Sequence, residues 1–227
     1  MLRSTFSILT LVACIAQADP AVACEPVRVS VSGTVDFNGI PFAPLSGAVP
    51  GAPMEVTFLI DSAVFVDSTS FPTRGYPIDE ASFELTIDGV EIGLQDPFPG
   101  TPYFVLRNDD PAVDGFFIAS SVDFPTGVAT DEPANLAPTF VHDFSVTYSG
   151  STLGSLDVLG ALGTYDFTGL SVFGWTMTDG PFQPLGGLFG TMTIETLAAV
   201  PGLPPGGVVL LSLLVAGAGV LVLRRGS

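Results

Sequence analysis

The chain contains 227 residues, 47% of them hydrophobic, with 26 Gly and 20 Pro. The apolar content is sufficient for a packed core and argues against disorder along the whole chain, while the Gly and Pro content is high for a helical protein. The 23 acidic residues and six Arg, without any Lys, give a formal net charge of −17, and a surface of this sign repels phosphate groups and excludes nucleic acid as a partner.

Residues 1–18 are predicted to form a signal peptide. Arg3 supplies a positive charge near the start, and Phe6–Ala16 is an apolar stretch of the length found in export signals. Ala16 and Ala18 are the small residues that signal peptidase requires, so cleavage after Ala18 leaves Asp19 at the start of the mature chain. The pattern predicts export from the cytoplasm.

A second processing site lies slightly downstream, because Ala21, Val22 and Ala23 place small residues in front of Cys24. This arrangement is similar to a lipoprotein lipobox, and cleavage there would make Cys24 a lipidated first residue. Cys14 lies within the signal peptide, so the mature chain has at most one thiol and no intrachain disulfide. The fold is therefore expected to depend on its apolar core alone.

Residues 19–196 are predicted to form one all-β domain, because apolar and polar side chains alternate with the period of two that strands require. About nine strands are expected, at 27–37, 54–60, 83–87, 90–94, 103–107, 116–122, 140–148, 171–178 and 188–196. Asp88-Gly89 predicts a tight hairpin turn. One apolar face per strand indicates antiparallel sheets packed face to face, and we expect a jelly-roll-like β-sandwich.

Residues 206–227 are predicted to form one transmembrane helix with a basic end. Gly206–Leu223 contains 18 residues without a charge, and a helix of that length spans about 27 Å, close to the hydrocarbon thickness of a bilayer. Arg224 and Arg225 follow this segment and are expected to stay in the cytoplasm, which places the β domain on the other side. Residues 197–205, rich in Pro, Gly and Ala, form the linker.

The linker, the apolar segment and the two terminal arginines together resemble the tripartite tail of the PEP-CTERM family, whose members are sorted by exosortases in Gram-negative bacteria. The sorting-motif residues are Val200, Pro201, Leu203 and Pro204, which match the Val-Pro-Leu-Pro-Ala variant apart from an inserted Gly202 and Pro205 in place of Ala. The resemblance covers roughly the last 28 residues. It implies transient retention in the inner membrane, processing by an exosortase-type enzyme, and delivery to the cell surface or exopolysaccharide matrix, without implying enzymatic activity.

Few residues between the two targeting segments point to catalysis. His142 is the only histidine, and strand alternation places it on the apolar face with Phe140 and Phe144, so we expect a core histidine. A zinc site needs further His or Cys ligands, which the mature chain does not supply. No G-x-S-x-G sequence supports a serine nucleophile either.

Calcium is the one cofactor that the sequence leaves open, and otherwise none is expected. Asn108, Asp109, Asp110 and Asp114 place four oxygen-bearing side chains within seven residues, in a loop between two predicted strands. Calcium prefers such oxygen ligands in flexible loops. The spacing lacks the order of a calcium-binding loop, so an ordinary acidic turn is the competing interpretation.

Two functions involving carbohydrate also stay open. A glycosidase needs paired carboxylates, but Glu84 and Asp88 would lie about 13 Å apart along one strand face, which is wide for such a pair. A carbohydrate-binding module would need an exposed ring, and the single Trp175 alternates with Phe173 and Met177 as a core residue does. The leading interpretation is a non-enzymatic, exported surface or matrix protein; the alternative is an extracellular carbohydrate-binding module or glycosidase on the same fold.

Overall fold

The computed structural model describes residues 25–110, 113–131, 140–149, 151–167, 173–178 and 184–197. These residues form an all-β fold in which helical structure is limited to three short 3₁₀ segments, η1 (Leu45–Gly47), η2 (Glu80–Ser82) and η3 (Val158–Ala161). No helix in this part of the chain is long and apolar enough to cross a membrane. The expected signal peptide and the expected membrane helix lie outside the described residues.

Thirteen strands are present in the described residues, and all of their named pairings are antiparallel. They are β1 (Pro26–Asn38), β2 (Pro53–Asp61), β3 (Val66–Asp67), β4 (Thr73–Pro77), β5 (Glu84–Ile87), β6 (Val90–Ile92), β7 (Tyr103–Arg107), β8 (Val113–Ala119), β9 (Val128–Ala129), β10 (Val141–Ser149), β11 (Gly163–Asp166), β12 (Phe173–Thr178) and β13 (Leu185–Thr196).

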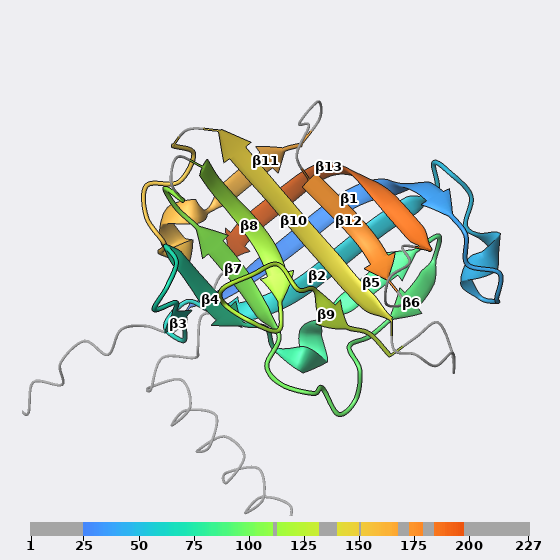
Figure 1. Ribbon diagram of the computed structural model, residues 1–227, viewed down its shortest axis with the longest axis horizontal. Helices are drawn as coiled ribbons and strands as arrows, with labels where there is room; N and C mark the ends of the chain where they lie inside the picture. Colours follow the sequence, from blue (N-terminus) through green and yellow to red (C-terminus); the bar gives the residue numbers. More distant parts are fainter. Residues whose placement is uncertain are drawn as a thin grey trace, which may run out of the picture.

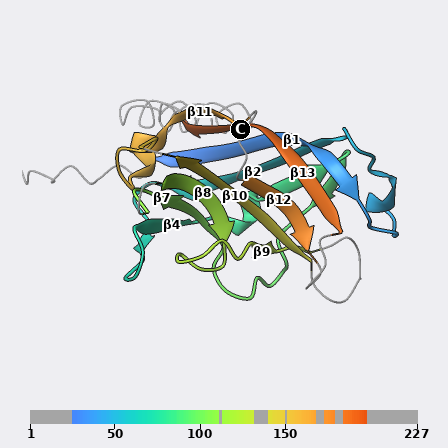
Figure 2. The same cartoon turned by 45° about the horizontal axis from the view of Figure 1, so that its top comes forward.

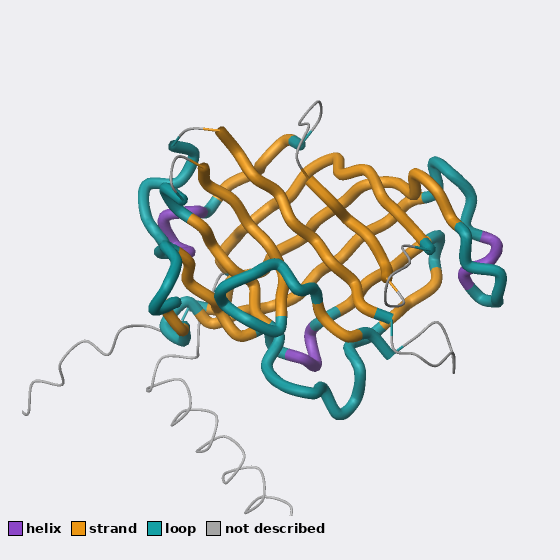
Figure 3. The backbone as a smooth tube through the Cα atoms, in the orientation of Figure 1, coloured by secondary structure: helices purple, strands orange, loops and turns teal. Residues whose placement is uncertain are grey.

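The strands follow one continuous order, β3-β4-β7-β8-β10-β12-β13-β1-β2-β5-β6, with β9 added to β10 and β11 added to β13. The sheet folds over into two layers, so that β8, β10 and β12 cross in front of β1 and β2 (Figures 1 and 2). The backbone trace shows the same crossed grid of strands (Figure 3). Two antiparallel layers around a shared core are consistent with a β-sandwich in which the strands of the layers cross.

Strand β13 joins the two layers, because it pairs with β12 near its start and with β1 along its whole length. Glycines make this close packing feasible: a Cβ on Gly186 would overlap the ring of Phe37, which lies across the strand from it. The β1–β13 register also shifts twice, once between Val35 and Phe37. Such irregularities bend a strand and increase its twist, which is what a strand shared by two layers needs.

The core lies between the layers and is lined by the apolar positions of each alternating strand. In β1 the side chains of Val27, Val29 and Val31 are fully buried, while the residues between them face outward. Strand β8 differs, because every residue from Asp114 to Ala119 is buried. The second face of β8 contributes Phe117 and Ala119 to a separate small cluster, which also contains Val105 and has Tyr103 packed against it.

The structure confirms the all-β fold and contains a strand in each of the nine predicted segments. The predicted hairpin turn is also present: Asp88 and Gly89 have φ values of 51° and 79° and connect β5 to β6. The predicted sandwich is confirmed at the level of two antiparallel layers, in which most strands pair with near neighbours in the chain, as in β1–β2 and β7–β8. Alternation identifies strands and their faces but carries no information about which strands pair.

Candidate functional site

The outer surface of the layer formed by β11, β13, β1, β2, β5 and β6 carries two regular rows of polar side chains, which we call the polar face. Successive strand residues point to opposite sides, so the residues between the core positions all face outward here. One row is Thr164, Thr193, Ser30, Thr57 and Glu84, and the next is Asp166, Thr191, Ser32, Glu55, Thr86 and Glu91. All of them are exposed or half-buried.

Hydroxyl groups on this face pair with one another across the strands. Ser32 Oγ lies 3.1 Å from Thr191 Oγ1, and Thr164 Oγ1 lies 3.4 Å from Thr193 Oγ1. Cross-strand pairs of this kind stabilise a sheet modestly, by about 0.2–1 kcal/mol each. Because a hydroxyl group both donates and accepts, each of these side chains keeps capacity for a further hydrogen bond.

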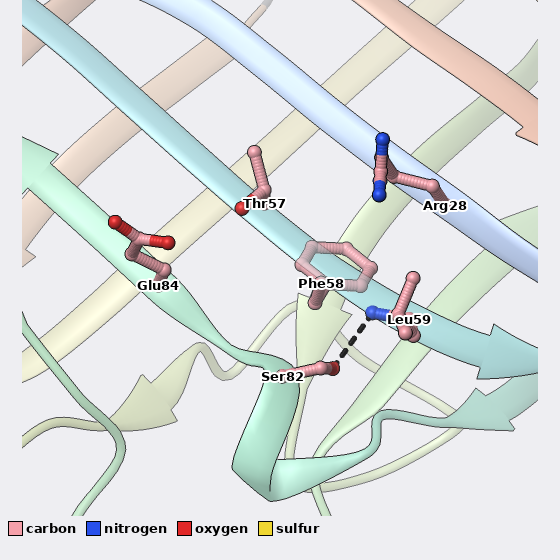
Figure 4. Close-up of a pocket in the computed structure, with 6 residues that line it drawn as sticks. All are labelled: Arg28, Thr57, Phe58, Leu59, Ser82 and Glu84. Atoms are coloured by element: carbon pink, nitrogen blue, oxygen red, sulfur yellow. Dashed lines mark hydrogen bonds between the residues drawn. The ribbon is translucent and has the colours of Figure 1, made fainter.

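Two shallow, adjoining hollows lie on the polar face. The larger is lined by Arg28, Thr57, Phe58, Leu59, Ser82 and Glu84 (Figure 4), and the smaller by Glu55, Thr57, Glu84 and Thr86. Ser82 Oγ accepts a hydrogen bond of 2.8 Å from the Leu59 amide, which fixes the end of η2 against β2. The larger hollow has a volume of about 210 Å³, below the roughly 300–1,000 Å³ of pockets that enclose small ligands.

The charged groups in these hollows come from three neighbouring strands. Arg28 on β1 lies 3.7 Å from Glu195 Oε1, and both side chains are about half exposed, so this ion pair is weak. Glu84 on β5 is paired in register with Thr57, while Glu55 on β2 is paired with Thr86. The two carboxylates are therefore diagonal neighbours, with backbones about 7–8 Å apart.

This arrangement corrects the expectation that Glu84 and Asp88 lie on one strand face. Asp88 lies in the β5–β6 turn with a positive φ, so it does not continue the strand alternation. The carboxylate that shares the smaller hollow with Glu84 comes from Glu55, a residue that the sequence did not single out. Finding it required the β2–β5 register, and nothing in the alternation of either strand specifies that register.

The loop proposed for calcium is organised around a buried carboxylate. Asp114 is fully buried at the start of β8, where one of its oxygens accepts from the Asp109 amide at 2.9 Å and the other accepts from the amides of Thr152 and Leu153. Asp110 instead lies 3.7 Å from Arg107 Nε. Asp114 thus ties two loops together through their backbone, which is a different role from the predicted calcium ligand.

No group of three or more His, Cys, Asp or Glu side chains positioned to hold a metal ion occurs within the described ranges. His142 is fully buried in β10, as predicted for a core histidine, and is paired in register with Met177 of β12 and Val128 of β9. Trp175 lies in β12 opposite Phe144 and Gly187. The prediction for the Trp175 side chain falls outside the side chains that the structure describes.

The remaining predicted site residues also fall outside the described part of the chain. They are Ala16 and Ala18 of the signal cleavage site, Cys24, the sorting-motif residues Val200, Pro201, Leu203 and Pro204, and the terminal Arg224 and Arg225.

The fold and its exposed surface define the chain as a two-layer, antiparallel all-β protein with an extended polar face. Comparison with known protein families, with curated proteins and with solved structures finds no match for the chain. The description of the chain as a two-layer all-β protein therefore rests on its own sequence and structure alone.

Proposed function

We propose that this chain is an exported, non-enzymatic β-sandwich protein that acts at the cell surface, or in the exopolysaccharide matrix, of a Gram-negative bacterium. The observation that carries the proposal is the polar face, on which hydroxyl and carboxylate side chains extend in rows from β11 to β6. A flat array of donors and acceptors suits contact with a hydrated, polyhydroxylated polymer better than the enclosure of one small molecule. The predicted signal peptide and the predicted C-terminal tail are the basis for the proposed location of the protein.

The charge of the chain supports the same environment. With a formal net charge of −17, the protein repels copies of itself and stays dispersed at high local concentration. The tail would hold the protein in the inner membrane until an exosortase-type enzyme acts near Val200–Pro204. The domain would then be free to join the matrix.

Intact-mass spectrometry of cell and medium fractions from the native host tests this proposal. We expect a medium form that starts near Asp19 and ends near Val200, because both end segments are processed. Acylation at Cys24 would show that the protein is exported but anchored through a lipid at its N-terminus. Full-length protein in the cytosol, with residues 1–18 retained, would contradict the proposal.

A glycosidase or carbohydrate-binding activity is the second candidate, and the diagonal pair Glu55 and Glu84 favours it. Both carboxylates line the smaller hollow, and glycosidases use a pair of carboxyl groups that flank the scissile bond. The first proposal predicts that the wild-type protein releases no reducing ends from the exopolysaccharide of the native host. The glycosidase proposal predicts that the wild-type protein releases reducing ends and that the rate falls by about 10²–10⁴-fold in Glu84→Gln. Glu91→Gln, which alters the same face outside the hollows, should retain the wild-type rate.

A further inference from the structure

The two ends of the β domain leave the fold side by side. Val27 of β1 pairs with Thr196 of β13, and the amide of Leu197 donates to the Pro26 carbonyl at 2.9 Å. Glu25 is joined to Ser62 just after β2 by two hydrogen bonds of 3.2 Å, one through each amide. The start of β1, the end of β13 and the end of β2 therefore form one corner of the molecule, which we call the exit corner.

Three consecutive exposed apolar residues follow directly from this corner. Val64, Phe65 and Val66 come after β2, and 50%, 43% and 44% of their surfaces are exposed. The amide of Val64 donates to the Asp61 carbonyl at 3.2 Å, and Asp61 is the residue that pairs with Pro26. The apolar segment is thus held next to the point where the chain leaves the domain.

The side chain of Arg74 lies over the ring of Phe65. The Arg74 guanidinium carbon lies 3.8 Å from the centroid of the Phe65 ring, which is a cation–π contact. Arg74 also donates to both oxygens of Asp67, at 2.6 and 3.0 Å, so the Asp67 carboxylate, which follows Val66 in the chain, is paired with a cation. These contacts fix the ring in place and remove a charge that would oppose an apolar environment.

The length of chain beyond Leu197 indicates what this segment contacts. Only eight residues separate Leu197 from the 18-residue uncharged stretch that begins at Gly206. Eight fully extended residues span at most about 29 Å. If the uncharged stretch lies in a bilayer, the exit corner is held within that distance of the lipid surface, whereas the far end of β1 lies about 40 Å from this corner along the strand.

We propose that Val64, Phe65 and Val66 rest in the headgroup region of the bilayer that holds the C-terminal segment, and so orient the domain with its exit corner toward the membrane. The inference rests on the membrane-retained stage of the proposed function.

Fluorescence quenching in proteoliposomes tests the orientation with the full chain. Phe65→Trp places a reporter in the apolar segment, and Val64→Trp is a second reporter in the same segment. Val49→Trp, in the loop at the far end of β1, is the matched control because Val49 is also exposed, at 61%. The wild-type protein supplies the background from Trp175, and the vesicles contain phosphatidylcholine with bromine close to the headgroup.

We expect the bromolipid to quench either reporter in the apolar segment at least twofold more than Val49→Trp. Flotation of the protein with vesicles after alkaline extraction reports insertion of the tail independently. Flotation with equal quenching of the reporters and the control would overturn the orientation but leave the proposed function intact. Protein that does not float would overturn both, and a reporter shielded from an aqueous quencher without bromine quenching would indicate a protein partner and overturn the lipid contact.

Discussion

Replacing Asp114 with Ala is expected to lower the free energy of unfolding by about 3–5 kcal/mol. The Asp114 carboxylate is fully buried and accepts hydrogen bonds from three backbone amides, those of Asp109, Thr152 and Leu153. The substitution leaves all three amides without their acceptor, at a cost of about 1–3 kcal/mol for each one that stays buried. Equilibrium urea unfolding, followed by far-UV circular dichroism, measures the loss.

Two further variants separate this role from a calcium-binding role. Asp114→Asn keeps one oxygen acceptor but points an amide group at backbone donors, so we expect an intermediate loss of about 2–3 kcal/mol. Asp110→Asn removes only the partly exposed contact with Arg107 and is expected to change stability by less than about 1 kcal/mol. An Asp114→Ala protein as stable as the wild type would contradict the assignment. A wild-type stability that rises with calcium, but not in Asp110→Asn, would restore the metal site.

The sequence predicts the strands where alternation is clean and misses those where it is not. β2 alternates over its full length and β1 does so from Pro26 to Ser32, and both lie within or close to the predicted ranges. β4 was not predicted because Gly75 and Pro77 interrupt its short pattern. Gly75 is required there, since a Cβ would meet Val122 Cγ1 at 2.5 Å. β8 begins at Val113, earlier than expected, because both of its faces are buried and a strand buried on both sides does not alternate.

The candidate site was less predictable than the fold for a related reason. Alternation assigns Arg28, Glu55, Thr57 and Glu84 to outward positions, but their grouping depends on the order and register of β1, β2 and β5. Strand order and register are set by pairing between segments far apart in the chain, and local sequence patterns carry no information about that pairing. The acidic residues near Asp114 were recognised as a cluster, yet the decisive partners, the amides of Thr152 and Leu153, lie 38 and 39 residues away.

Tyr76→Phe is the second substitution with a large expected effect, a loss of about 2–4 kcal/mol. Tyr76 is fully buried on β4, and its hydroxyl donates to the Leu156 carbonyl at 2.8 Å and accepts from the Val158 amide at 2.9 Å. This single group holds the segment around η3 against the first half of the chain. Its removal leaves a buried donor and a buried acceptor unpaired, and urea unfolding measures the cost.

Tyr148→Phe is the matched control, because the same atom is removed from a different environment. The Tyr148 hydroxyl is buried and has no hydrogen-bond partner among the described residues, so its loss is expected to be neutral or to stabilise the protein by up to about 1 kcal/mol. Equal losses for Tyr76→Phe and Tyr148→Phe would contradict the role given to the Tyr76 hydroxyl, because its two hydrogen bonds would then add nothing to stability.

The same tyrosines predict how stability depends on pH. Burial raises the pKa of Tyr76, Tyr148 and Tyr165 above the ordinary value of 10.0, because a low-dielectric interior disfavours the phenolate. In the unfolded chain these groups ionise near pH 10, while the folded protein keeps them neutral. Their contribution is therefore complete below about pH 10 and is lost as the pH rises through the higher folded-state pKa values. The urea midpoint of the wild type should fall as the pH rises above 10, and the midpoint of Tyr148→Phe should fall less steeply. If the two midpoints fall in parallel with pH, ionisation of Tyr148 does not contribute to the loss of stability.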